Sequence, residues 1–268
     1  MTDVKRLRPL QYRSIFISDT HLGFRGARAD YLLEFLESVE CETLYLVGDI
    51  LDLWEMRRGL HWPDSHNAVV QNILQRARNG TRVIYIPGNH DEMMRDYAGM
   101  SVEGIDIRLR AVHECVNGRR LLVLHGDEFD TVVQCSRLVA MLGNRMYAWL
   151  IRANDWVNRL RSAFNRPYWS LAAHLKHRVK NAMQYIANYE EALVHEARQA
   201  GLDGLVCGHI HHAELSERDG LIYCNDGDWV ESCTALVETR HGELSLLNWV
   251  EMREALGEAA GNARRRAA

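Results

Sequence analysis

Polar and ionisable residues follow five short apolar runs of the sequence, each at the point where a strand should end. The runs lie at 15–17, 45–47, 84–86, 121–124 and 206–207. The blocks that follow them are Ser18-Asp19-Thr20-His21, Gly48-Asp49, Gly88-Asn89-His90-Asp91, His125-Gly126-Asp127 and Gly208-His209-Ile210-His211. Strand ends that converge on one edge of an α/β sheet are where ligands bind. We therefore expect a functional site at that edge.

The residue types of these blocks suit a site for transition-metal ions. Imidazole together with carboxylate favours manganese, iron or zinc over magnesium and calcium, which prefer oxygen alone. The candidates are Asp19, His21, Asp49, Asn89, His90, Asp91, His125, Asp127, His209 and His211. They exceed the coordination shell of one ion, so two divalent ions are expected, with manganese as the preferred assignment. Such a pair clamps the attacking and leaving oxygens of a phosphoryl displacement and lowers the pKa of bound water towards ~7.

The segments between these blocks predict an α/β fold. Apolar residues at helical spacing predict helices over Asp30–Glu40 and Ser65–Asn79, with an irregular loop over Ile50–Asp64 before the second. Strands are expected over 15–18, 44–48 and 82–87, and later at 105–107, 111–116, 120–125, 203–207, 221–224, 233–238 and 243–249. The early strands alternate with helices and should be parallel, whereas the later ones should form an antiparallel part. We expect two packed sheets with helices outside, in a single domain over residues 1–268.

The composition is that of an ordinary globular protein. The 268 residues are 47% hydrophobic and 25% charged, with a net charge of −4. Six scattered cysteines without a Cys-x-x-Cys pair predict reduced thiols and no disulfide framework. The polar N-terminus lacks the apolar part of a signal peptide, and no apolar run approaches the roughly 20 residues that span a bilayer. These features favour a cytoplasmic protein.

A basic and aromatic segment separates the two halves of the chain. Residues 131–180 carry seven arginines and two lysines against one acid, Asp155, which is a net charge of +8. Arg145, Arg152 and Arg159 recur every seven residues and so lie on nearly one helical face. We expect a helical insertion over 131–185 that acts as a lid for an anionic, partly apolar ligand. The alternative is an ordinary helical hairpin with a solvated basic face.

Three residues near the blocks carry less specific signals. Asp52 and Asp130 could contact and orient the residues of the site or have no role in it. Trp229 is expected to be a packing residue.

Taken together, the five blocks resemble the signature blocks of the calcineurin-like metallophosphoesterases. They occur in that family's order and span residues 19–211. The resemblance implies a four-layer α-β-β-α sandwich and two metal ions. It assigns one ion to Asp19, His21, Asp49 and His211, and the other to Asp49, Asn89, His125 and His209. It also implies that His90 contacts the phosphate and protonates or stabilises the leaving oxygen, with Asp91 orienting His90.

Within this superfamily the chain resembles the branch that contains UDP-2,3-diacylglucosamine hydrolase, a peripheral membrane enzyme of lipid A synthesis. That branch characteristically has Arg after the Asn of the third block, where this chain has His90. The resemblance implies a nucleotide-linked glycolipid substrate and contact with an anionic inner membrane surface. The alternative is a relative that acts on another phosphoester or pyrophosphate.

Two further functions fit the same core less well. A nuclease or cyclic-nucleotide phosphodiesterase should show a continuous basic groove, whereas positive charge here concentrates in the aromatic insertion. A non-catalytic scaffold should have lost some of the metal-binding blocks, and all five are intact.

Overall fold

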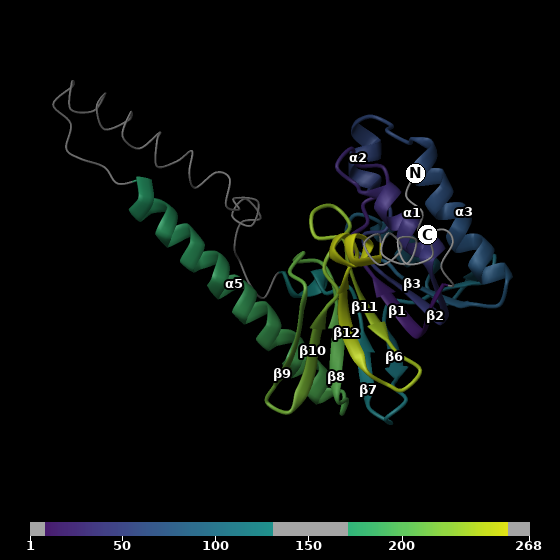
Figure 1. The fold of residues 1–268 in the computed structure, drawn as a ribbon. Coiled ribbons are helices and arrows are strands. Elements are labelled where there is room, and N and C mark those ends of the chain that lie inside the picture. Colours follow the sequence, from purple (N-terminus) through teal and green to yellow (C-terminus); the bar gives the residue numbers. More distant parts are fainter. Residues whose placement is uncertain (1–8, 131–170, 257–268) are drawn as a thin grey trace, which may run out of the picture. The chain divides into compact units, whose positions relative to one another are not determined.

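The computed structural model describes residues 9–130 and 171–256, with the side chains of its last long helix given from residue 185 onward. The chain forms two compact units. One contains the residues up to Asp127 and from Leu193 onward, and the other is Glu128–Ala192. All strands of the described residues belong to the first unit and form two sheets (Figure 1).

The larger sheet has seven strands in the order β12-β11-β1-β2-β3-β5-β4. Their bounds are β1 Leu10–Ile17, β2 Val39–Val47, β3 Arg82–Ile86, β4 Ser101–Val102, β5 Ile105–Ile107, β11 Thr234–Glu238 and β12 Leu244–Asn248. The strands β1, β2, β3 and β5 are parallel, so three of them end at the same edge in the first three polar blocks.

The smaller sheet has five strands in the order β6-β7-β8-β10-β9. Their bounds are β6 Ala111–Glu114, β7 Arg120–Val123, β8 Gly204–Cys207, β9 Glu214–Arg218 and β10 Leu221–Asn225. The neighbours β7 and β8 are parallel, and they lead into the fourth and fifth polar blocks.

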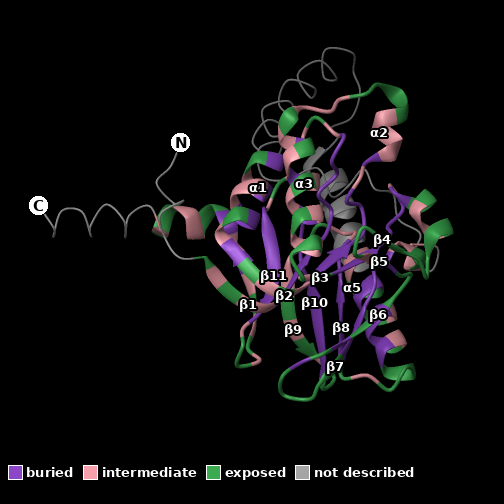
Figure 2. Ribbon diagram, turned by 90° about the vertical axis from the view of Figure 1, so that its right-hand side faces the viewer, coloured by how far each residue is buried: buried purple, intermediate pink, exposed green. Residues whose placement is uncertain are grey.

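Helices α1 Ala29–Ser38 and α3 Asp64–Arg78 flank the larger sheet. The other described helices are α2 Leu53–Arg58, α5 Leu171–Gln199 and a final helix over 249–256, with 3-10 turns η2 Glu92–Tyr97 and η3 Asp127–Phe129. Apolar residues of α1 and α3, such as Phe35 and Val69, form one core with Ile15 and Ile17 of β1. The intervening Phe16 points the other way, into the core between the sheets. Figure 2 shows how the buried residues follow the strands.

The expected α/β fold with two sheets and helices outside is confirmed, but the division into parallel and antiparallel parts is only partly correct. The late strands β11 and β12 return to the larger sheet, where β11 pairs antiparallel with β1. In the smaller sheet β8 is parallel to both β7 and β10. Chain order therefore did not indicate which sheet a strand joins.

Several element boundaries also differ from the expected ones. The helix α1 ends at Ser38 and β2 begins at Val39, whereas a helix to Glu40 was expected. The first half of β2 pairs with the first half of β1 through the backbone, and polar side chains there hide the strand pattern. The short helix α2 lies in the expected loop over Ile50–Asp64, and β4 and β9 were not predicted.

The expected lid falls largely outside the described residues. Of the segment 131–185 the structure gives Leu171 onward, which is the beginning of α5. Arg145, Arg152 and Arg159 lie outside the described residues, so their predicted role is untested. Among the described helices, none combines the length and apolar character that crossing a membrane requires.

A network of ion pairs and hydrogen bonds joins the two sheets and is centred on the buried Glu238 of β11. Its Oε2 accepts hydrogen bonds from Arg13 on β1 at 2.8 Å and lies 3.0 Å from the His113 ring on β6. Its Oε1 accepts from the Val116 amide at 2.9 Å. Burial tends to raise the pKa of Glu238, but the hydrogen bonds from His113, Val116 and Arg13 outweigh it and lower the pKa to about 2.

The network predicts an acid-dependent loss of stability. Since the folded pKa of Glu238 lies below the ordinary 4.5, its contribution is complete above pH 4.5 and disappears as the pH falls through about 2. At pH 7 it is worth at most about 3 kcal/mol. We expect Glu238→Gln to lower the free energy of unfolding at pH 7, and its difference from wild type to shrink towards pH 2. Urea titrations at several pH values measure this, and a difference independent of pH would contradict it.

Candidate metal centre

The polar blocks at the ends of β1, β2, β3, β7 and β8 come together in the first unit. Among the described residues of these blocks, three groups of ligand atoms each lie within 4.8 Å of one another. Their members are Asp19, His21 and His211; His21, Asp49 and His90; and Asp49, His125 and His209. The sequence-predicted candidates of all five blocks therefore meet at one edge, where the two sheets approach each other.

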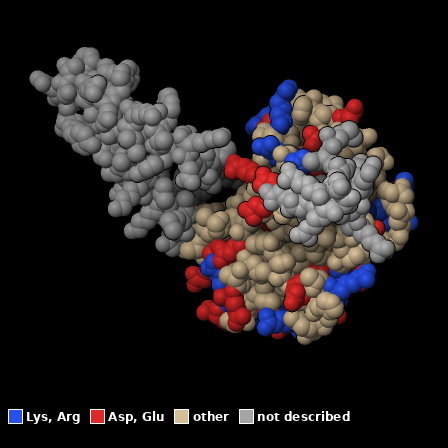
Figure 3. Space-filling model, in the orientation of Figure 1, with Lys and Arg blue, Asp and Glu red and all other residues tan. Residues whose placement is uncertain are grey.

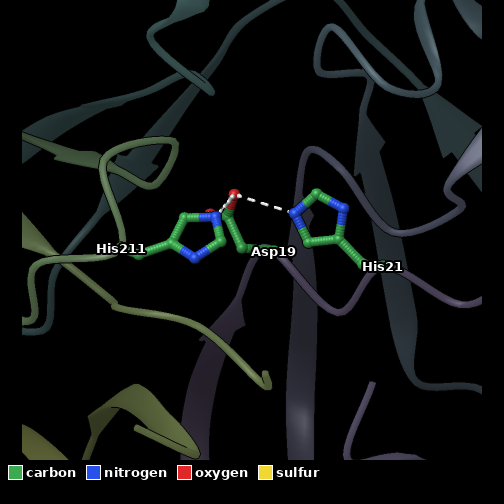
Figure 4. Close-up of side chains that lie close together, drawn as sticks. All are labelled: Asp19, His21 and His211. Atoms are coloured by element: carbon green, nitrogen blue, oxygen red, sulfur yellow. Dashed lines mark ion pairs between the residues drawn. The ribbon is translucent and has the colours of Figure 1, made fainter. Parts of the chain in front are cut away.

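Asp19 and Asp49 lie at the centre of these groups. Asp19 Oδ1 is 3.0 Å from His211 Nε2 and 3.7 Å from His21 Nε2 (Figure 4). Asp49 Oδ2 is 3.9 Å from His21 Nε2 and 3.5 Å from His125 Nε2. The Asp49 carboxylate is thus shared between two groups, which is the arrangement that a bridging ligand requires.

Buried polar atoms at this edge lack hydrogen-bond partners. Within the described part of the chain they include His21 Nε2, His125 Nε2 and both side-chain polar atoms of Asn89. An unsatisfied buried polar atom costs roughly 1–3 kcal/mol, so such a cluster needs a further partner. Imidazole nitrogens, carboxylates and an amide oxygen fit divalent cations, and the residues present therefore fit a metal centre.

The backbone is strained at the same residues. Asp19, His21, Asp49, His209 and His211 all have left-handed backbone conformations, with φ between 46° and 72°. Side chains other than glycine rarely adopt this region, and such strain persists where the surroundings enforce it, commonly at functional sites. Here the loops are tied together by the bonds from the Asp19 amide to the Gly48 carbonyl, 3.0 Å, and from the His21 amide to the Asp49 carbonyl, 2.9 Å.

The carboxylates at this edge raise the pKa of two neighbouring histidines. Burial would lower the pKa of His21, but the carboxylates of Asp19 and Asp52 outweigh that effect and raise its pKa to about 10. Burial likewise opposes ionisation of His125, and the neighbouring Asp49 raises the pKa of that ring well above its ordinary value. A cation at these nitrogens therefore competes with protons, and its binding releases them.

The Asp52 carboxylate contacts the Nδ1 atoms of two histidine rings. It is the N-cap of α2, and its Oδ1 accepts a hydrogen bond from the Glu55 amide at 2.9 Å. Its Oδ2 lies 3.0 Å from His21 Nδ1, and its Oδ1 lies 3.0 Å from His90 Nδ1. Burial tends to raise the pKa of Asp52, but its contacts with the two rings and the Glu55 amide lower it well below the ordinary value. The Nδ1 atom of His21 therefore faces a carboxylate, which leaves Nε2 for an ion.

Asp91 does not have the neighbour that we expected. Its buried carboxylate accepts hydrogen bonds from the amides of Ile50 at 2.8 Å and Gly88 at 2.6 Å, and from the Tyr85 hydroxyl. It therefore fixes the loops after β2 and β3. The carboxylate beside the His90 ring is that of Asp52, so our assignment of that contact to Asp91 is corrected.

The two other acids near the blocks have partners of their own. Both carboxylate oxygens of Asp127 accept hydrogen bonds from Arg95 Nη2, at 2.8 and 2.7 Å. In the second unit, Asp130 accepts a hydrogen bond of 2.5 Å from the Tyr185 hydroxyl.

Two further residues were not predicted from the sequence. Trp54 lies two positions after Asp52, and the centroid of its ring is 4.3 Å from that of the His90 ring. Ser18 contacts Asp19 through its hydroxyl at 2.6 Å. The only local signal for either was its position beside a recognised residue. Trp229, expected to be a packing residue, is fully buried against Phe35.

The absence of a side chain at Gly88 leaves room for Asp49 and His125, which follow two different strands. A Cβ at this position would lie 2.7 Å from both the Asp49 amide nitrogen and His125 Cδ2. Since the Asp49 backbone cannot move without disturbing its hydrogen bonds, we expect Gly88→Ala to weaken metal binding at least tenfold. Gly59→Ala is the control, because nothing lies within 4 Å of its added Cβ. Calorimetric titration with Mn²⁺ compares the two, and equal affinities would contradict the prediction.

Comparison with known proteins was consistent with this geometry. The family model for calcineurin-like phosphoesterases matches residues 12–213. A curated UDP-2,3-diacylglucosamine hydrolase from Neisseria meningitidis serogroup B is 24% identical over 80% of this chain and 88% of its own length. Proteins of the same name from Edwardsiella ictaluri and Pseudomonas aeruginosa PA14 are 28% and 27% identical. These two alignments cover 75% and 74% of this chain, and 77% and 81% of the relatives.

Proposed function

Because the chain belongs to the calcineurin-like phosphoesterase family, we propose that it hydrolyses the pyrophosphate of a nucleotide-linked diacylglucosamine, as an enzyme of lipid A synthesis. Its family and its hydrolase relatives make it a metal-dependent phosphoesterase. The family and the clustered His and Asp residues indicate a binuclear site for divalent ions. The proposed substrate is supported by the names of the relatives.

We propose the following ligands for the two ions. One ion would be held by Asp19, His21, Asp49 and His211, and the other by Asp49, Asn89, His125 and His209. The observation that carries this assignment is the shared Asp49 carboxylate among buried ligand atoms without hydrogen-bond partners in the described residues. When bound, the ions supply positive charge for the phosphoryl group and its displacement. Manganese is the preferred ion, with iron or zinc as alternatives.

His90 is proposed as the residue that protonates or stabilises the leaving oxygen. Its Nε2 is 3.9 Å from Asp49 Oδ2, and its side chain is 22% exposed, so it borders the metal-binding edge and remains reachable. Asp52 contacts Nδ1 and Trp54 covers the ring, which together limit its orientation. A positioned acid of this kind contributes typically 10²–10⁴-fold to turnover. In this proposal Asp91 supports the site indirectly, by fixing the loops that carry Asn89 and His90.

A hydrolysis screen with metal analysis tests the substrate. The purified protein, loaded with Mn²⁺, is offered a UDP-linked diacylglucosamine, nucleotides and DNA. Preferred cleavage of the glycolipid supports the proposal, whereas preference for nucleotides or DNA would favour the related phosphodiesterase. A nucleic-acid substrate also needs an extended basic surface. On the face in Figure 3, acidic and basic side chains of the described residues are instead interspersed.

The basic insertion provides a second test of the substrate. If Arg145, Arg152 and Arg159 bind the phosphate of a lipid-linked substrate, their joint replacement by alanine should lower hydrolysis of the glycolipid at least tenfold. A small phosphodiester should be cleaved as before, because remote binding energy serves only the substrate that reaches the insertion. The variant should also bind anionic liposomes less, since each basic residue near such a surface contributes about 1 kcal/mol. Equal losses on both substrates, with unchanged liposome binding, would exclude the lid and peripheral membrane contact.

A further inference from the structure

Asp226 is a fully buried acid behind the candidate metal centre that the proposed mechanism does not use. It follows β10, and its amide donates a hydrogen bond of 3.0 Å to the Cys207 carbonyl, directly before the fifth polar block. Its Oδ1 lies 2.6 Å from the Ser18 hydroxyl. Its Oδ2 is buried and has no hydrogen-bond partner in the part of the chain that the structure describes.

The Ser18 hydroxyl connects Asp226 to Asp19. Ser18 Oγ is 2.6 Å from Asp226 Oδ1, 2.6 Å from Asp19 Oδ2 and 3.0 Å from the Gly227 carbonyl. A hydroxyl has one hydrogen, so it can donate to only one of two carboxyl groups at these distances. The other short contact needs a hydrogen on the carboxyl side. Burial raises the pKa of Asp226 well above its ordinary value, which agrees with Asp226 as the donor to Ser18.

This chain of hydrogen bonds sets the orientation of the Asp19 carboxylate. Asp19 Oδ2 receives the Ser18 hydroxyl and, at 2.8 Å, the amide of His209. With Oδ2 held on this side, Oδ1 faces the rings of His21 and His211. A carboxylate held by a hydroxyl and an amide presents the same oxygen to an ion each time, and loss of the hydroxyl loosens that hold.

Neighbouring residues hold the turn around Asp226. Asn225 accepts from the Gly227 amide at 3.0 Å and donates to the Gly208 carbonyl at 2.7 Å. Asp228 accepts from the amides of Val230 and Glu231, at 2.8 and 2.5 Å. The Asp226 carboxyl group, by contrast, is directed at Ser18.

We propose that Asp226 is a positioning residue for the metal centre, which fixes Ser18 and through it Asp19, and so sets the affinity for the ion beside Asp19. The proposal rests on the assignment of Asp19 as a metal ligand. Residues that orient metal ligands typically contribute 10- to 100-fold to metal affinity. The effect should concern one ion of the pair, because Asn89 and His125 do not depend on this hydrogen-bond chain.

Titration of the metal-free, full-length protein with Mn²⁺ tests this, with the signal of the free ion followed by electron paramagnetic resonance. Wild type should bind two ions, and Asp226→Ala should bind one of them 10- to 100-fold more weakly. Asp226→Asn should retain both affinities, because its amide can donate to Ser18. Thr234→Val is the matched control: it removes the 2.9 Å bond to the Asp226 main-chain carbonyl, so it should lower the unfolding midpoint but keep both ions.

The Ser18→Ala variant keeps the test decisive if Asp226→Ala folds poorly, because it should produce the same loss. Where the double variant folds, adding Asp226→Ala to Ser18→Ala should weaken metal binding no further, since the two residues act through one chain. Wild-type affinities in folded Ser18→Ala or Asp226→Ala, or failure of folded Asp226→Asn, would overturn the inference. If wild type itself does not bind two ions, the proposed function fails instead.

Discussion

The Asp49→Ala variant is expected to lose hydrolysis of every phosphoester substrate and to bind fewer than two metal ions. The Asp49 carboxylate is shared by two groups of ligand atoms, with Oδ2 at 3.5 Å from His125 and 3.9 Å from His21. Its Oδ1 also accepts a hydrogen bond of 2.7 Å from the His90 amide. Removing it takes away a ligand of both proposed ions and loosens the loop that carries the proposed acid.

The design of this test must separate chemistry from backbone strain. Asp49 has a φ of 52°, where alanine costs roughly 1–2 kcal/mol. Asparagine tolerates this conformation, so Asp49→Asn should remove the charge without the strain and lose activity as completely. Asp30→Asn, at an exposed acid in the first turn of α1, serves as a control for the loss of one negative charge. Turnover like that of wild type in a folded Asp49→Asn variant would exclude the two-metal mechanism.

His90→Ala should reduce turnover by about 10²-fold or more while leaving both ions bound. The ring borders the metal-binding edge, but it is 22% exposed and contacts Asp52 through Nδ1. Because our ligand assignment does not include it, its loss should affect the protonation of the leaving oxygen rather than metal affinity. Turnover is measured with substrates whose leaving groups differ in pKa, and the loss should be smallest for the most acidic leaving group.

The structure also allows a competing role for His90, that of a metal ligand. His21, Asp49 and His90 form one of the groups whose ligand atoms lie within 4.8 Å, so His90 could itself hold an ion. Metal analysis decides between the roles. A His90→Ala variant that has lost an ion would show that His90 is a ligand, and an equal loss for all leaving groups would exclude the acid role.

The sequence by itself indicated the class of fold and most of the residues that the structure brings together at the candidate metal centre. Apolar runs mark buried strands because burial on both faces requires apolar side chains. A polar block after each run then marks a strand end. The types in these blocks, imidazole and carboxylate, indicated divalent metal ions before any distance was known.

Only the tertiary structure decided which side chains support which ligands. Asp91 follows His90 directly in the sequence, yet its carboxylate binds the amides of Ile50 and Gly88. Asp52, distant in sequence from both His21 and His90, contacts the two rings. Adjacent residues on an irregular loop point in different directions, so nearness in sequence is a poor guide to contact there.

The same limit applies to the partners that come from the far end of the chain. Ser18 and Asp226 are 208 positions apart and meet at 2.6 Å because β1 and β10 belong to different sheets whose ends approach each other. Similarly, β11 joins the larger sheet beside β1, although it follows β10 of the smaller sheet in the sequence. Hydrophobic periodicity reports how deeply a strand is buried, whereas the choice of its neighbour depends on packing over the whole core, which no local pattern encodes.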